Sequence, residues 1–138
     1  MAIYLADKSA LTRSDTRPQV REVVEPLLIA GRIATCGIVD LELLYSAPNP
    51  ATYSELAVAL RAMPRVAVTE AVVDRALAVQ AQLAAMSQHR SVPLPDLLIA
   101  ACAEAAGLTV LHYDADYDRI ASLTNQPVQW VVPRGSVP

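Results

Sequence analysis

The stretch Pro95–Asp118, PDLLIAACAEAAGLTVLHYDADYD, most strongly limits what this chain can fold into. It predicts an apolar helix led by Asp96, a turn at Gly107 and a short strand over Thr109–His112. Directly after that strand, three aspartates fall within five residues: Asp114, Asp116 and Asp118. Carboxylates beside buried apolar segments are costly unless something neutralises their charge. The simplest such partner is a divalent cation, so this stretch predicts a helix–strand unit next to a metal site.

Short apolar segments alternate with helical patterns along the rest of the chain. The further predicted strands are Ala2–Ala6, Ile33–Cys36, Val66–Val68 and Val128–Val132. The further predicted helices are Ala10–Arg13 with Ser9 as its cap, Val20–Leu28, Ile38–Tyr45, Ala51–Met63, a helix capped by Thr69 whose buried stripe ends at Met86, and one around Tyr117–Leu123. This alternation predicts an α/β domain with a small, mainly parallel sheet flanked by helices.

Composition narrows the class of protein. A chain of 138 residues with 54% hydrophobic side chains forms one domain with a substantial core, and its net charge of −3 gives no overall basic character. A nucleic-acid partner would therefore be held by a local patch or through metal ions. Cys36 and Cys102 stand apart in apolar surroundings, which predicts reduced, buried thiols and no zinc site. No segment approaches the roughly 20 apolar residues of a membrane span, so we expect a soluble, cytoplasmic protein.

Carboxylates from four separate segments are predicted to meet at one edge of the sheet. Asp7 ends the first strand and Asp114 follows a later one, and ligand sites in parallel sheets form where strands end. Asp96 lies in the first turn of its helix, and Glu42 lies in a helix that is apolar on nearly every side, which predicts an interior position. Oxygen ligands of this kind suit Mg²⁺ or Mn²⁺, and such ions support phosphoryl chemistry.

Each of these acids also has a purely structural explanation. Asp7 is in position to cap the helix that follows it, and the helix dipole alone favours Asp96 at a helix N-terminus. Asp40, beside Glu42, is expected to be such a first-turn partner. The aspartates after the strand Thr109–His112 are common turn residues. The shared location of the acids, rather than any one of them, is what indicates a site.

Four motifs together resemble the PIN-domain family, in particular the VapC-type toxins of bacterial toxin–antitoxin modules. They are LADKSA (Leu5–Ala10), IVDLELLYSA (Ile38–Ala47), VPLPDLLIAACAEAAG (Val92–Gly107) and VLHYDADYDRIA (Val110–Ala121). The resemblance covers nearly the whole chain. It implies a three-layer α/β/α PIN-like nuclease domain over residues 1–132, followed by a C-terminal tail over residues 133–138.

The resemblance also implies roles for individual residues. The implied catalytic acids are Asp7, Glu42, Asp96 and Asp114, and the implied ligands of Mg²⁺ or Mn²⁺ are Asp7, Asp96, Asp114 and Asp116. Ser9 matches a small hydroxyl residue that orients a carboxylate or a metal-bound water. Lys8 stands where most relatives carry Thr or Ser, and it either meets a substrate phosphate or points to solvent. Tyr117 is expected to pack, and Asp118 to cap its helix.

The implied function is that of a metal-dependent endoribonuclease, the toxin of a type II toxin–antitoxin system, which hydrolyses tRNA, rRNA or mRNA to leave a 5′-phosphate and a 3′-hydroxyl. The candidate RNA contacts are Lys8, Arg13, Arg17 and Arg90. The implied partner is a VapB-type antitoxin, for which the helices Val20–Leu28 and Ala51–Met63 offer a groove, in a homodimer or a toxin–antitoxin hetero-oligomer. Two alternatives remain: a PIN-like module that binds RNA or protein without cutting, and a phosphatase that uses Asp7 as nucleophile, although that chemistry calls for a second acid at position 9, which is Ser9.

Overall fold

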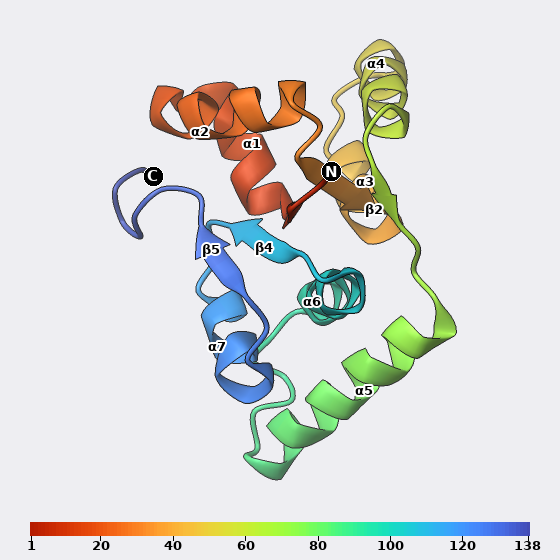
Figure 1. Ribbon diagram of the computed structural model, residues 1–138, viewed down its shortest axis with the longest axis vertical. Coiled ribbons are helices and arrows are strands. Elements are labelled where there is room, and N and C mark those ends of the chain that lie inside the picture. The colour runs from red at the N-terminus through yellow and green to blue at the C-terminus, as the bar shows by residue number, and fades with distance from the viewer.

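A five-stranded, all-parallel sheet forms the centre of the protein (Figure 1). The computed structural model describes all residues from Met1 to Pro138. The strands are β1 (Tyr4–Ala6), β2 (Ile33–Cys36), β3 (Arg65–Val66), β4 (Thr109–His112) and β5 (Val128–Trp130), in the spatial order β3-β2-β1-β4-β5. The predicted α/β class with a mainly parallel sheet is confirmed.

Seven helices connect and cover these strands. They are α1 (Lys8–Thr16), α2 (Pro18–Ile29), α3 (Gly37–Tyr45), α4 (Pro50–Arg61), α5 (Glu70–Ala85), α6 (Leu94–Ala106) and α7 (Asp116–Thr124). None of them is both long and apolar enough to cross a bilayer. The segments β2 and β4 begin and end where the sequence predicts, because each is a short apolar run bounded by turn residues or by a new helix.

The sheet has a separate apolar core on each face. Successive residues of a strand point to opposite faces, so Leu5 and Val110 enter a large core shared with α3 and α5–α7, whereas Ala6 and Leu111 enter a smaller one. The smaller core is closed by α1, α2 and the chain after β5, including the buried Val137. The result is the three-layer arrangement of helices, sheet and helices.

Strand register brings the ends of β1 and β4 together. Ala6 pairs with Leu111, and the backbone N–H of Asp7 donates to the carbonyl of Leu111 at 2.9 Å. The first residue after β1 therefore lies beside the loop that leaves β4. This register sets the position of the site described below.

Several local predictions are wrong. Helix α1 extends from Lys8 to Thr16, longer than the predicted Ala10–Arg13, because Asp7 rather than Ser9 is its N-cap. Helix α3 is not buried on all sides, since Leu41 and Tyr45 are 68% and 92% exposed. Met86 ends α5 and is exposed rather than part of its buried stripe. Hydrophobic periodicity shows which residues are apolar, but it does not show which of them the fold leaves uncovered.

Candidate metal centre

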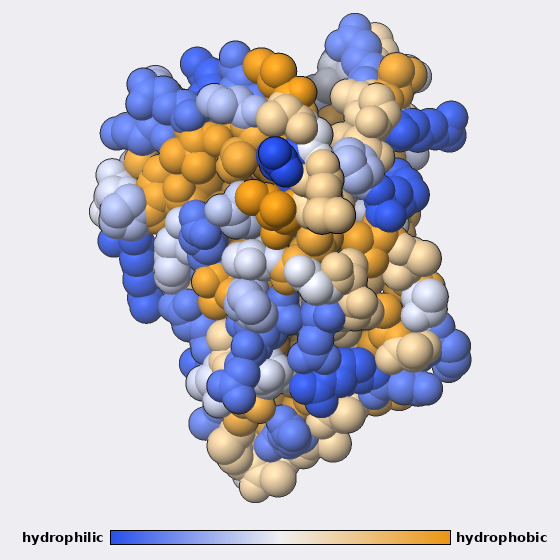
Figure 2. All heavy atoms as spheres, in the orientation of Figure 1, coloured by the Kyte–Doolittle hydropathy of each residue, from blue (hydrophilic) through white to orange (hydrophobic).

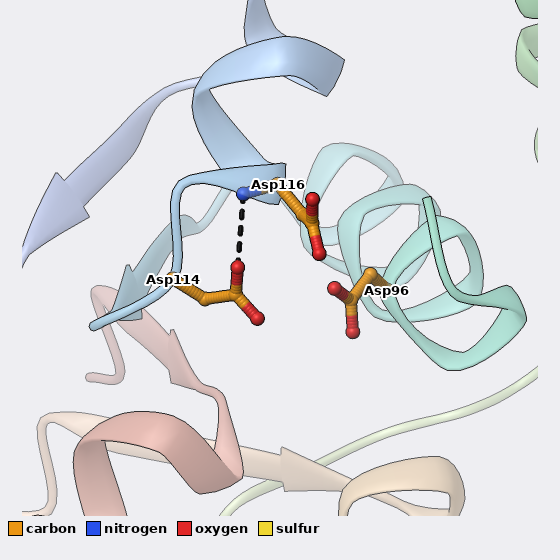
Figure 3. A group of neighbouring side chains, drawn as sticks. All are labelled: Asp96, Asp114 and Asp116. Carbon is orange, nitrogen blue, oxygen red and sulfur yellow. Dashed lines mark hydrogen bonds between the residues drawn. The ribbon is translucent and has the colours of Figure 1, made fainter. Parts of the chain in front are cut away.

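Three carboxylates converge where β4 ends and α6 begins (Figure 3). Asp96 projects from the first turn of α6, Asp114 from the loop after β4, and Asp116 from the first residue of α7. One oxygen from each lies within 4.8 Å of the other two. The structure thus brings together three of the acids that the sequence singles out.

The loop that carries Asp114 is fixed by hydrogen bonds at successive residues. The N–H of Tyr113 donates to Ser9 Oγ at 2.9 Å, and the N–H of Asp114 donates to His112 Nδ1 at 3.1 Å. The N–H of Asp116 donates to Asp114 Oδ1 at 2.9 Å, the dashed line in Figure 3. Ser9 therefore orients the loop through its hydroxyl, and the carboxylate of Asp114 is directed by its own neighbour.

His112 supports this loop as a neutral side chain. It is fully buried between the rings of Tyr117 and Trp130, whose centroids each lie 5.0 Å from its own. Burial lowers the pKa of His112. Because Nδ1 accepts a hydrogen bond, the ring proton sits on Nε2, which has no partner. The sequence pattern gave His112 no role.

Asp7 is buried beside the three carboxylates but is held by the protein itself. Its Oδ2 accepts from the N–H of Ser9 at 3.0 Å, and its Oδ1 accepts from the hydroxyl of Tyr117 at 2.8 Å. Asp7 therefore caps α1, as its structural explanation anticipates, and does not belong to the group of three. Tyr117 does more than pack. With both oxygens of Asp7 engaged, the geometry also disfavours a phosphatase that uses this residue as a free nucleophile.

Among the clustered carboxylates, Asp96 has the pKa that its surroundings raise the most. It is 6% exposed, and its Oδ2 has no hydrogen-bond partner. Burial, followed by the charges of Asp7, Asp114, Asp116 and Glu42, raises the pKa of Asp96 to about 8. Burial and Asp114 also raise the pKa of Asp116. The four other predicted acids therefore all act on Asp96, although only Asp114 and Asp116 have an oxygen within 4.8 Å of one of its own in the group of three.

Glu42 lies near the site and is paired with the side chain of Lys8. Its Oε2 forms an ion pair with Lys8 Nζ at 3.2 Å, and its Oε1 is buried without a partner. The side chain of Glu42 is 17% exposed, against 50% for Lys8. Lys8 therefore does not simply point to solvent, because it is paired with Glu42, and its expected contact with a substrate phosphate stays a prediction.

The donor set fits a hard divalent cation. The three converging side chains offer only carboxylate oxygens, which such ions prefer, and two buried oxygens, Asp96 Oδ2 and Glu42 Oε1, lack any donor from the protein. A buried, unsatisfied carboxylate oxygen costs free energy unless a ligand or a proton supplies the missing partner. The cluster is consistent with a metal-ion site.

The other singled-out residues lie at varying distances from this cluster. Arg13 packs over the ring of Tyr113 at 4.6 Å, whereas Arg17 lies at the junction of α1 and α2, and Arg90 is exposed in the loop before α6. Asp118 is not a cap; it accepts from Trp130 Nε1 at 3.1 Å. Asp40 lies in the first turn of α3 as predicted, and it bonds to Thr35 and Arg65.

Comparison with known proteins identifies the family to which this fold and acidic cluster belong. The profile of the PIN domain matches residues 4–123. The chain is 51% identical to Ribonuclease VapC51 of Mycobacterium tuberculosis over 134 residues, covering 97% of this chain and 96% of that protein. It is 46% identical to Ribonuclease VapC21 of the same species, with 96% of each chain covered.

Solved structures share the fold at low sequence identity. The DNA-bound VapBC complex of Salmonella typhimurium matches with a TM-score of 0.75 at 20% identity, over 96% of this chain and all of that one. VapBC2 of Rickettsia felis, bound to a promoter fragment, matches with a TM-score of 0.73 at 20% identity, over 93% and 98%. The chain therefore belongs to the PIN-domain family and, within it, to the VapC ribonucleases. The predicted family and enzyme class are confirmed.

Proposed function

We propose that this protein is a Mg²⁺- or Mn²⁺-dependent endoribonuclease whose metal ion is held by Asp96, Asp114 and Asp116. The observation that carries the proposal is Asp96, a buried carboxylate with an unpartnered oxygen that faces two further carboxylates and no cationic side chain in direct contact. A divalent cation bound there would lower the pKa of a water and offset charge on a phosphodiester under attack. The relatives' names, Ribonuclease VapC51 and VapC21, support RNA as the substrate.

Other residues around the proposed metal ion are assigned supporting roles. Asp7, through the Tyr117 hydroxyl and the Ser9 N–H, fixes the start of α1 and adds negative charge next to Asp96. Glu42 offers the free Oε1 as an acceptor for a water proton, while Lys8 holds its other oxygen. Ser9 and His112 keep Asp114 in place. The expected products carry a 5′-phosphate and a 3′-hydroxyl.

A cleavage assay with a matched variant tests this proposal. Purified protein is incubated with mixed tRNA, rRNA and mRNA fragments, and the ends are sequenced. We expect cleavage with Mg²⁺, none with EDTA, and none from Asp114→Asn, whose amide oxygen still accepts from the Asp116 N–H. Undiminished cleavage by Asp114→Asn or in EDTA would contradict the proposal. RNA binding without turnover would indicate the non-cleaving module instead.

The partner is proposed to be a VapB-type antitoxin that lies in an apolar cleft distinct from the acidic site. The cleft has a volume of about 360 Å³ and runs between α2 and α4, with Val24 and Leu28 on one side and Leu56 and Leu60 on the other. The same two helices also carry exposed hydrophobic residues outside the lining of the cleft, Ile29 and Val58. Figure 2 shows hydrophobic residues on the half of the molecule that carries α2. Two structural neighbours of this chain are VapBC complexes, and this supports an antitoxin as the partner.

A pair of surface substitutions separates antitoxin binding from catalysis. Leu28→Glu, in the cleft, is expected to weaken capture of the cognate antitoxin while RNA cleavage is retained. Leu77→Glu, on the exposed side of α5, serves as the control. Equal antitoxin binding by the two variants would place the interface elsewhere. Whether the free toxin forms a homodimer stays a prediction, which sedimentation of the purified chain would answer.

A further inference from the structure

A second, polar groove opens directly beside Asp114. Its volume is about 770 Å³, within the range of ligand clefts. One wall is α1, with Lys8 and Arg13, and the other is the chain after β5, with Arg134. Tyr113 and Trp130 form part of its floor. The groove therefore adjoins the proposed metal centre at Asp114 and adds residues to which the cleavage chemistry gives no role, namely Arg13, Trp130 and Arg134.

The charge of this groove is opposite to that of the whole protein. Three cationic side chains line it, Lys8, Arg13 and Arg134, and Asp114 at its inner end is the only carboxylate. The protein as a whole has a net charge of −3. Lys8 is paired with Glu42, but neither arginine forms an ion pair with a carboxylate. Arg13 already donates from Nε and Nη1 to the backbone oxygens of Pro138 and Ser9, so its Nη2 and the whole guanidinium of Arg134 are what the groove offers to an anion.

Both arginines lie over aromatic rings that are themselves held in place. The Arg13 guanidinium lies 4.6 Å from the ring centroid of Tyr113, and that of Arg134 lies 5.5 Å from the ring of Trp130. Trp130 packs edge-on against Tyr113 at 5.2 Å, and its indole N–H donates to Asp118. Fixed aromatic and guanidinium planes are the surfaces on which unpaired bases stack.

The chain after β5 is tied to the loop that carries Asp114. The Tyr113 hydroxyl donates to the carbonyl of Val137 at 2.7 Å and accepts from the N–H of Gly135 at 2.8 Å. Arg13 Nε donates to the carbonyl of Pro138 at 3.1 Å, and the Val137 side chain is buried. The wall that presents Arg134 is thus built onto the floor of the groove, at a defined position relative to Asp114.

From this juxtaposition we infer that the groove binds a single-stranded segment of the RNA substrate on one side of the scissile phosphate. Arg13 and Arg134 contact its phosphates, and a base stacks on Trp130 and Arg134. The inference rests on the proposed function for the identity of the substrate. It assigns the C-terminal residues a part in substrate binding, which neither the motifs nor the acidic cluster indicates.

Binding measured without turnover tests the groove separately from cleavage. The probe is a fluorescent 12-nucleotide RNA without secondary structure, titrated by anisotropy at several salt concentrations against Asp96→Asn protein in EDTA. Three variants are made in that background: Arg134→Gln, Trp130→Leu and, as a control, Arg61→Gln. Arg61 is exposed at the end of α4 and lies outside the groove.

We expect Arg134→Gln to weaken binding and to reduce the slope of log K against log salt by about 0.7, the value for one lost phosphate contact on a single strand. Trp130→Leu should weaken binding about fivefold or more through lost stacking. Arg61→Gln should bind like the parent, and a duplex of the same sequence should bind less tightly than the single strand.

Arg134→Gln and Arg61→Gln binding equally well, or a duplex binding as tightly as the single strand through these residues, would overturn the inference. Because Trp130 packs on His112 and Tyr113, its variant is first checked by thermal melting; the exposed Arg134 keeps the test decisive if that variant fails to fold. A protein that binds through the groove but never cleaves with Mg²⁺ would contradict the proposed function and support the groove.

Discussion

Helix α6 carries a carboxylate near each end, and the fold surrounds the two in opposite ways. Near its C-terminus, Glu104 is paired with Arg75 through two hydrogen bonds, at 2.7 and 3.3 Å. In its first turn, Asp96 is buried, has an oxygen without a partner, and faces Asp114 and Asp116. Both side chains belong to one rigid helix, so the difference lies in what the neighbouring elements supply.

The carboxylates of Glu104 and Asp40, away from the acidic cluster, receive hydrogen-bond or ion-pair partners from neighbouring elements. Asp40 follows the same rule as Glu104, with Thr35 and Arg65 as partners. At Asp96 the neighbouring elements contribute more carboxylates instead, and burial, followed by these negative charges, raises the pKa of Asp96 to about 8. That arrangement opposes stability in the absence of a cation, and the binding of one would offset it.

The largest expected effect is on catalysis. Asp96→Asn should reduce Mg²⁺-dependent RNA cleavage about a hundredfold or more, as for loss of a group that holds transition-state charge in place. Glu104→Gln, at the other end of the same helix, should cleave at close to the wild-type rate. Initial rates on one labelled RNA give both values. Comparable losses in the two variants would erase the distinction between the two carboxylates.

The next effect concerns stability as a function of pH in EDTA. The pKa of Asp96 is raised on folding, so its contribution to stability is fully present below about pH 4 and is lost as pH rises toward about 8. Asp96→Asn has no such loss. The melting temperature of this variant should therefore rise relative to wild type as pH increases from about 4 to about 8, by an amount that reflects roughly a few kcal/mol. A difference that does not change with pH would contradict the electrostatic account.

A smaller effect is expected from the cation paired with Glu42. Lys8→Met removes the ion pair and leaves Glu42 as a further unpaired carboxylate beside the cluster. We expect Mn²⁺ affinity to rise several-fold, because added negative charge favours the cation, and the metal-free protein to be less stable. Lys8→Arg keeps a positive charge and is the control. Unchanged Mn²⁺ affinity in Lys8→Met would mean that Glu42 does not act on the site.

The smallest effect is expected at the satisfied end of α6. Both partners of the Arg75–Glu104 pair are about one-third exposed, so Arg75→Gln should lower the free energy of unfolding by no more than about 1 kcal/mol. The loss should shrink further in high salt. Chemical denaturation at two salt concentrations measures it. A loss of several kcal/mol would show that solvent does not screen this pair.

The sequence predicts the elements that depend on local pattern. The strands Ile33–Cys36 and Thr109–His112 and the caps at Thr69 and Gly107 agree with the structure because a short run of residues decides each of them. The exposed side of α3 could not be predicted, since an exposed apolar residue looks in the sequence like a buried one. Tyr45 and Leu41 are exposed apolar residues of this kind.

The candidate site likewise combines features that local sequence predicts with contacts that it does not. Residue types and strand ends are enough to predict that Asp96 and Asp114 meet, whereas Asp116 is indicated by the family resemblance. The Tyr117 hydroxyl on Asp7 joins residues 110 positions apart in sequence, and the Lys8–Glu42 pair joins α1 to α3. These contacts depend on how helices are set against the sheet, which spacing along the chain does not specify. Arg134 over Trp130 was missed for the same reason.

Calorimetric titration of Mn²⁺ tests the central claim most directly, namely that Asp96 is left unpaired because it holds a cation. Wild type, Asp96→Asn and Glu104→Gln are titrated at pH 7 in two buffers of different ionisation enthalpy. We predict binding by wild type and Glu104→Gln with release of protons, since the pKa of Asp96 lies near 8 before the ion binds. We predict little or no binding by Asp96→Asn. Equal binding by all three proteins, without proton release, would contradict the account.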